Sequence, residues 1–167
     1  MALTKTRSRG INLADTFAFT GTVSGAGGTN TPSFLASRTG SNQTITANTW
    51  TKVQFNDELL DTDNMYDHTT NYRFTPTVAG KYYIFANIYP SATNTHIYGA
   101  IYFNGAGYFP IQVADASQGG GVFIANIITF NGSSDYVEAY TYHGTSTGGI
   151  EDASQDTLFG GYKLIGV

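Results

Sequence analysis

The segment WTKVQFNDELLDTDNMYDHTTNYRFTPTVAGKYYIFANIYP, residues 50–90, decides the fold class of this chain. Its last part alternates as a β-strand does, because successive side chains of a strand point to opposite faces. One face then carries Tyr82, Ile84, Ala86 and Ile88, and the other carries Tyr83, Phe85, Asn87 and Tyr89. Both faces are apolar or aromatic, whereas a strand of an antiparallel sheet usually has one wet face. The chain has no helical pattern, so we expect another copy of the same protein to cover the second face.

A family resemblance rests on the same segment. The order WTKVQF, NMYD and YRFTPTVAGKYYIF resembles the globular head of complement component one-q and its tumour necrosis factor relatives. An F-x-x-x-x-x-G-x-Y-x-F segment of that superfamily is matched by Phe74, Gly80, Tyr82 and Ile84, with Ile84 replacing the usual Phe. The closing LFGGYKL, residues 158–164, is similar to the family's S-x-F-S-G-F-x-L strand. The resemblance covers roughly Ser33 to Val167, and it implies an all-β jelly-roll β-sandwich that forms a homotrimer.

The composition is typical of one β-rich domain, and it argues against disulfides, thiolate metal sites and membrane insertion. The 167 residues include 20 Gly, 12 Tyr and 11 Phe, with only 12% charged residues, which suits strands joined by tight turns. Because the chain has no cysteine, neither a disulfide nor a thiolate metal site can form. No apolar run is long enough to cross a membrane, so we expect no membrane insertion.

Charge separates the beginning of the chain from the rest. Three of the eight basic residues are Lys5, Arg7 and Arg9, which leaves five basic against twelve acidic residues in the remainder. That balance argues against nucleic acid as a partner. The basic segment could meet an acidic surface, or it could be a solvated tail.

The first 30 residues are interpreted as an arm that precedes the head domain, residues 31–167. The opening TKTRSRGINLADTFAFTGTVSGAGG resembles the N-terminal segments of marine tailed-phage structural proteins. A short alternating stretch at residues 16–23 cannot bury its face alone, and a Gly-rich linker, residues 24–30, follows it. That face could pack on the chain's own domain or on another protein. From the resemblance to phage structural proteins, we expect the arm to dock on another virion protein through Lys5, Arg7, Arg9, Ile11, Leu13, Phe17 and Phe19.

Turn signals divide the second half of the head into hairpins. Asn104-Gly105 predicts a hairpin between residues 97–104 and 107–114. A second hairpin is expected between residues 122–130 and 136–142, turned at Asn131-Gly132. Residues 56–68 and 144–156 are predicted to be loops.

The first of these loops raises the question of a metal. Five carboxylates, Asp57, Glu58, Asp61, Asp63 and Asp67, could bind calcium, although the spacing fails as an EF-hand because Met65, Tyr66 and Tyr72 occupy required positions. A solvated loop is the plainer interpretation, and no cofactor is expected. The sequence has no nucleophile elbow, H-E-x-x-H or triad signature, so we expect a protein that is not an enzyme.

The excess of aromatic residues points to a binding surface. Tyrosines suit interfaces because one end is apolar and the other can meet water. We expect one stripe across neighbouring strands to form the trimer interface, made of Tyr83, Phe85, Tyr89, Tyr98, Tyr102, Tyr140 and Tyr142. The alternatives are that several of these residues fill a wide core, or that exposed tyrosines in the loops bind sugar.

Together these features favour a virion protein, a trimeric head decoration or fibre-type appendage of a tailed phage anchored by its N-terminal arm. The alternative is a receptor- or glycan-binding module at a fibre tip that acts in host adsorption. Its binding surface would be the loops at residues 56–68, 116–121 and 144–156.

Overall fold

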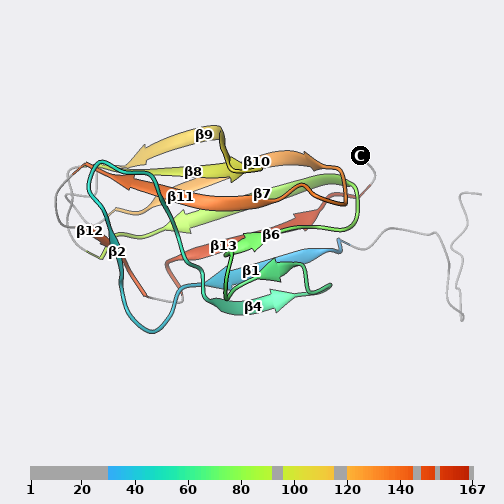
Figure 1. Cartoon of the computed structure of the whole chain (residues 1–167), viewed down its shortest axis with the longest axis horizontal. Coiled ribbons are helices and arrows are strands. Elements are labelled where there is room, and N and C mark those ends of the chain that lie inside the picture. Colours follow the sequence, from blue (N-terminus) through green and yellow to red (C-terminus); the bar gives the residue numbers. More distant parts are fainter. Residues whose placement is uncertain (1–29, 92–95, 115–119, 145–147, 153–154, 166–167) are drawn as a thin grey trace, which may run out of the picture.

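The computed structural model describes residues 30–91, 96–114, 120–144, 148–152 and 155–165. These residues form a β-sandwich of antiparallel sheets and include no helix (Figure 1). The all-β sandwich expected from the sequence is therefore confirmed. Within the described ranges, no helix is long and apolar enough to span a bilayer.

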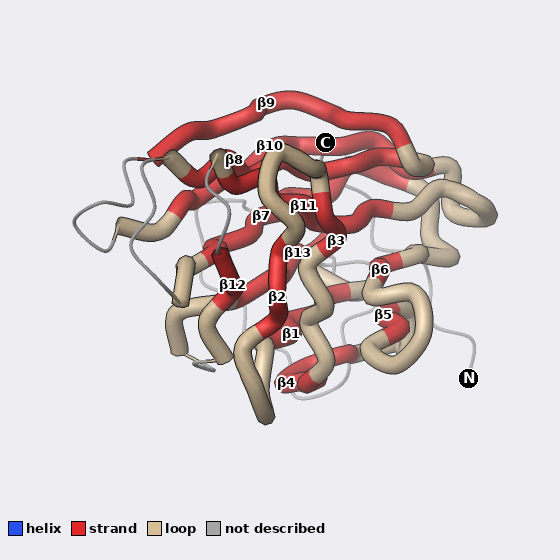
Figure 2. Tube along the Cα trace, turned by 60° about the vertical axis from the view of Figure 1, so that its left-hand side comes forward, coloured by secondary structure: helices blue, strands red, loops and turns tan. Residues whose placement is uncertain are grey.

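Two sheets make the layers of the sandwich. The five-stranded sheet has the order β10 (Val122–Phe130), β7 (Gly80–Ile88), β13 (Leu158–Lys163), β1 (Ser33–Ser37) and β4 (Asp57–Asp61). The six-stranded sheet has the order β5 (Tyr66–Asp67), β6 (Arg73–Phe74), β11 (Val137–His143), β8 (Ile97–Phe103) and β9 (Ala106–Ala114), with β3 (Thr51–Lys52) paired to β11. A small pair, β2 (Gln43–Ile45) and β12 (Gly148–Ile150), lies at one end of the sandwich (Figure 2).

Aromatic rings fill much of the space between the sheets. The Phe34 ring stacks on the Phe74 ring with 4.2 Å between centroids, and it meets the Phe159 ring edge to face with 4.9 Å between centroids. The ring centroids of Tyr82 and Phe130 are 5.0 Å apart. All five side chains are buried. The core therefore contains aromatic rings from both sheets, and each sheet pairs strands that are far apart in the sequence.

Strand β7 is apolar on both faces, as the sequence predicts. The inward Tyr82, Ile84, Ala86 and Ile88 are fully buried, and the outward Tyr83, Phe85 and Asn87 are half-buried. β7 is an inner strand of its sheet, because β10 pairs along its whole length on one side and β13 pairs with residues 82–87 on the other.

The hairpin predicted at Asn104-Gly105 is confirmed. These two residues have positive φ angles of 52° and 78°, and Phe103 pairs with Ala106 across the turn. Asparagine and glycine tolerate positive φ better than other residues, which explains why the chain reverses here.

The second predicted hairpin is wrong. β10 pairs with β7 in the five-stranded sheet, whereas β11 pairs with β8 in the six-stranded sheet. The turn between them crosses from one layer to the other, and the Asn131 side chain holds it by accepting hydrogen bonds from the N–H groups of Ser133 and Ser134 at 2.8 and 3.0 Å. Both strands have a buried apolar face, so they cover the same core from opposite sides.

The two predicted loops also contain short strands. Residues 56–68 include β4, which pairs with β1, and β5, which pairs with β6. Residues 144–156 include β12. The sequence hides these strands because their alternation is too short to separate from a polar loop.

Candidate binding surfaces

The outward side of the five-stranded sheet is one candidate surface. We call it the apolar face, and it consists of Leu35, Leu60, Tyr83, Phe85, Phe123, Ile127 and Tyr162. Four of these side chains are well exposed: Phe123 at 56%, Ile127 at 54%, Leu60 at 48% and Tyr162 at 38%. Large apolar groups gathered on one sheet face are typical of an interaction site.

Strand pairing brings these residues into rows. Tyr83 lies opposite Ile127 on one neighbouring strand and opposite Tyr162 on the other. In the next row Phe85 lies between Ala125 and Gly160. The Tyr83 and Tyr162 rings are 5.7 Å apart, so the face is continuous across three strands.

The outward side of the six-stranded sheet is a second candidate surface. We call it the aromatic patch, and it consists of Trp50, Tyr98, Tyr102, Tyr140 and Tyr142. Tyr102 and Tyr140 stack at 3.8 Å, and the Trp50 ring lies 6.1 Å from Tyr102 and 5.7 Å from Tyr142. All five residues are half-buried, because each ring packs on its neighbours while part of it meets solvent.

One ion pair borders the aromatic patch. The Lys52 ammonium lies 2.5 Å from the Glu138 carboxylate, whose side chain is only 5% exposed. Burial raises the pKa of Tyr140 to about 12, and the nearby Glu138 carboxylate adds to the rise. Burial also raises the pKa of Tyr102. Both phenols therefore stay protonated at neutral pH.

The two surfaces correct the prediction of a single aromatic stripe. Tyr83 and Phe85 lie on the apolar face, whereas Tyr98, Tyr102, Tyr140 and Tyr142 lie on the other sheet. Tyr89 follows the end of β7. Its ring packs closely against Gly121, where an added Cβ atom would stand only 2.7 Å from the ring. The seven residues cannot form one stripe because the sandwich core separates the two sheets. An interface role stays a prediction for each of them.

Three surface residues are not among those that the sequence predicts for a site. They are Trp50 of the aromatic patch and Phe123 and Ile127 of the apolar face. The signal for the last two was present, since residues 122–130 alternate apolar side chains on both faces as β7 does. The predicted arm residues, Lys5 to Phe19, lie outside the described residues.

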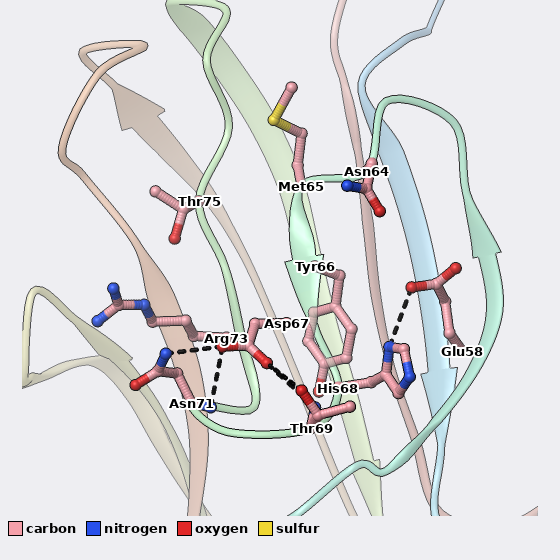
Figure 3. Close-up of a pocket in the computed structure, with 10 residues that line it drawn as sticks. All are labelled: Glu58, Asn64, Met65, Tyr66, Asp67, His68, Thr69, Asn71, Arg73 and Thr75. Atoms are coloured by element: carbon pink, nitrogen blue, oxygen red, sulfur yellow. Dashed lines mark hydrogen bonds and ion pairs between the residues drawn. The ribbon is translucent and has the colours of Figure 1, made fainter.

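The acidic segment forms a hollow of about 480 Å³ beside β5. Two carboxylates of this segment accept hydrogen bonds from the protein: Asp57 from the Ser37 hydroxyl of β1 at 3.0 Å, and Asp61 from the Tyr66 N–H at 2.7 Å. Figure 3 shows Asp67 turned toward Asn71 and Thr69, and His68 turned toward Glu58. The His68 Nδ1 atom lies 3.2 Å from Glu58 Oε2. Hydrogen bonds, led by the one from the Thr70 N–H, hold the pKa of Asp67 well below its usual range.

No calcium site emerges from this geometry. Among the residues that the structure describes, no three His, Cys, Asp or Glu side chains gather as metal ligands would. Calcium binding by Asp57, Glu58, Asp61, Asp63 and Asp67 stays a prediction without support from their arrangement.

Comparison with known proteins places the fold. No protein-family model and no curated protein matches the chain. Among solved structures it is similar to murine APRIL, with a TM-score of 0.61 at 10% identity over 79% of this chain and 98% of that one. It is also similar to the globular domain of zebrafish complement 1qA, with a TM-score of 0.60 at 19% identity over 80% of this chain and 97% of that one.

A viral structure is also similar. The vertex protein P5 of PRD1 matches with a TM-score of 0.55 at 14% identity, over 79% of this chain and 94% of that one. The chain has the sandwich fold of the tumour necrosis factor and complement one-q heads. At these identities the similarity establishes the fold alone.

Proposed function

We propose that this protein is a structural component of a phage particle, a head decoration or fibre-type appendage that assembles as a homotrimer. The observation that carries the proposal is the apolar face of the five-stranded sheet, where Phe123 and Ile127 are more than half exposed. A closed ring of three copies would bury such a face against the neighbouring copies, and soluble homo-oligomers are mostly closed. The similarity to the PRD1 vertex protein supports a place on a virion.

In this proposal the protein acts by binding and not by chemistry. Residues 1–30 dock the head on the particle, with Lys5, Arg7 and Arg9 supplying positive charge. Phe17 and Phe19, at alternate positions of the arm, are then buried against the docking partner. The resemblance of this segment to marine tailed-phage structural proteins is what supports the arm.

Native mass tests the assembly. We would measure it by light scattering for the full chain and for a chain that begins at Thr31. Both are expected to have the mass of three chains, because the apolar face belongs to the head. A monomeric full chain would overturn the homotrimer.

Attachment tests the virion role. Particles produced with a chain lacking residues 1–30 are expected to lack the protein, while the shortened chain keeps its native mass. Unchanged incorporation into particles would disprove the docking role of the arm.

A second candidate function is favoured by the aromatic patch. A receptor- or glycan-binding module at a fibre tip needs a surface away from the subunit contacts. The aromatic patch lies on the opposite sheet from the apolar face, so both surfaces could operate in one molecule.

A further inference from the structure

We propose that the aromatic patch is a binding site for a neutral oligosaccharide, with the primary sugar held by Trp50, Tyr98 and Tyr142. This inference rests on the binding function named second above, and it does not require the homotrimer. It places the glycan on the face of the six-stranded sheet and not in the loops that the sequence pointed to.

The shape of the site comes from three rings. A cleft of about 240 Å³ is lined by Trp50, Tyr98 and Tyr142. The Tyr98 and Tyr142 rings are 5.5 Å apart and nearly perpendicular, at 85°, so one forms a floor and the other a wall. Trp50 closes the cleft at 5.7 Å from Tyr142. The axial C–H groups of a sugar ring make an apolar patch that fits such a floor.

The edge of the cleft supplies hydrogen-bonding groups. The Tyr142 hydroxyl donates to Asn48 Oδ1 at 2.9 Å, and the Asn48 N–H donates to the His143 carbonyl at 2.8 Å. Asn48 is exposed and has a φ angle of 57°. A phenol and an amide held in place beside apolar ring faces suit a ligand with hydroxyl groups around an apolar centre.

Charge decides which ligand fits. The Lys52 ammonium at the patch is already paired with the Glu138 carboxylate, at 2.5 Å. The described side chains that line the cleft carry no charge, so an anionic sugar would find no cation among them. A quaternary ammonium would need ring faces on several sides, and the perpendicular contact of Tyr98 with Tyr142 already uses one of them. A neutral ligand is therefore favoured.

The patch is longer than one sugar. Tyr102 and Tyr140 stack at 3.8 Å beyond Trp50, and they offer a second ring platform on the same sheet face. The platform is preassembled, so binding does not require ordering these side chains. The apolar face differs, because its three most exposed residues, Phe123, Ile127 and Leu60, have no polar atom in their side chains.

The test uses the single tryptophan of the chain as its probe. The full chain is first screened on an array of neutral and anionic glycans. The strongest neutral oligosaccharide is then titrated while the emission of Trp50 is recorded. We expect a saturable change, and we expect Tyr98→Ala to weaken binding by about tenfold or more, since a stacked ring is lost.

Two variants serve as controls. Tyr98→Phe keeps the ring and is expected to keep most of the affinity. Val78→Ser, at an exposed position in the turn before β7 and outside both surfaces, is expected to leave the affinity unchanged. Thermal unfolding and native mass of Tyr98→Ala are compared with the parent to separate loss of binding from loss of fold or assembly.

Three outcomes would overturn the inference: no neutral glycan binds on the array, Tyr98→Ala binds as the parent does, or choline chloride saturates the Trp50 signal while sugars do not. Glycan binding by a monomeric chain would overturn the homotrimer and leave this inference standing. A trimer that binds no neutral glycan would leave the homotrimer standing and overturn this inference.

Discussion

Gly160 of β13 lies directly opposite Phe85 of β7, and a Cβ atom on Gly160 would stand 2.7 Å from the Phe85 ring. The same Cβ would lie 3.0 Å from the Leu35 side chain on the other neighbouring strand. Because Gly160 has no side chain, Phe85 and Leu35 of the apolar face can pack over β13 at this position. Phe85 is only half-exposed for this reason, while Phe123 and Ile127 on the edge strand β10 stand clear.

Replacing this glycine should disturb the face. Gly160→Val is expected to destabilise the protein by about 1–3 kcal/mol, because the added methyl groups overlap Phe85 and Leu35. Thermal unfolding measures the loss. Gly144→Val is the matched control, since a Cβ atom there meets nothing within 4 Å. Equal unfolding temperatures for the two variants would contradict the packing described here.

A charge on the apolar face should prevent assembly. Ile127→Lys places an ammonium where 54% of the side chain is exposed in one chain, so the fold is expected to survive while the buried interface does not. Light scattering is expected to report one chain in place of three. Val78→Lys, at 42% exposure in the turn before β7, should keep the trimer. Retention of the trimer by Ile127→Lys would exclude this face as the contact.

A buried hydroxyl should contribute to stability. The Tyr66 hydroxyl donates to the Phe55 carbonyl at 3.0 Å inside the core. Tyr66→Phe leaves that carbonyl without its donor and is expected to cost about 1–3 kcal/mol. Chemical denaturation compares it with Tyr162→Phe, whose ring is 38% exposed and whose change should be small.

The same residue should make the fold sensitive to alkali. Burial raises the pKa of Tyr66 above its ordinary value, so the folded state holds its proton where the unfolded state loses it. Stability is then lost as the pH rises above about 10, where tyrosine ionises in the unfolded chain. The decline should be shallower in Tyr66→Phe, and identical slopes would count against this explanation.

Mild acid should weaken the fold through His143. Burial lowers the pKa of His143 below its ordinary value. The unfolded chain then takes up a proton at a pH where the folded chain does not, so stability is complete above about pH 6.5 and falls as the pH drops toward the folded pKa. Unfolding free energies between pH 7.5 and 5.5 test this. His143→Gln should flatten the slope whatever its absolute stability, and a slope as steep as that of the parent would contradict this explanation.

Some predictions from the sequence held because they depend on a few neighbouring residues. The two-faced pattern of residues 81–89 and the Asn104-Gly105 turn are set by alternation and by backbone preference. The hairpin expected between residues 122–130 and 136–142 failed because nothing local distinguishes a turn within a sheet from a turn between sheets. Only the partners of each strand, β7 for one and β8 for the other, decide that.

The sequence by itself therefore determined that the chain is a β-sandwich with more aromatic surface than one core needs. The tertiary structure alone decided where that surface lies. Tyr83 and Tyr98 look alike in the alternation of their strands, but they face outward from opposite layers. The physical reason is that strand pairing joins residues far apart in the chain, and it is this pairing that puts the apolar face on one layer and the aromatic patch on the other.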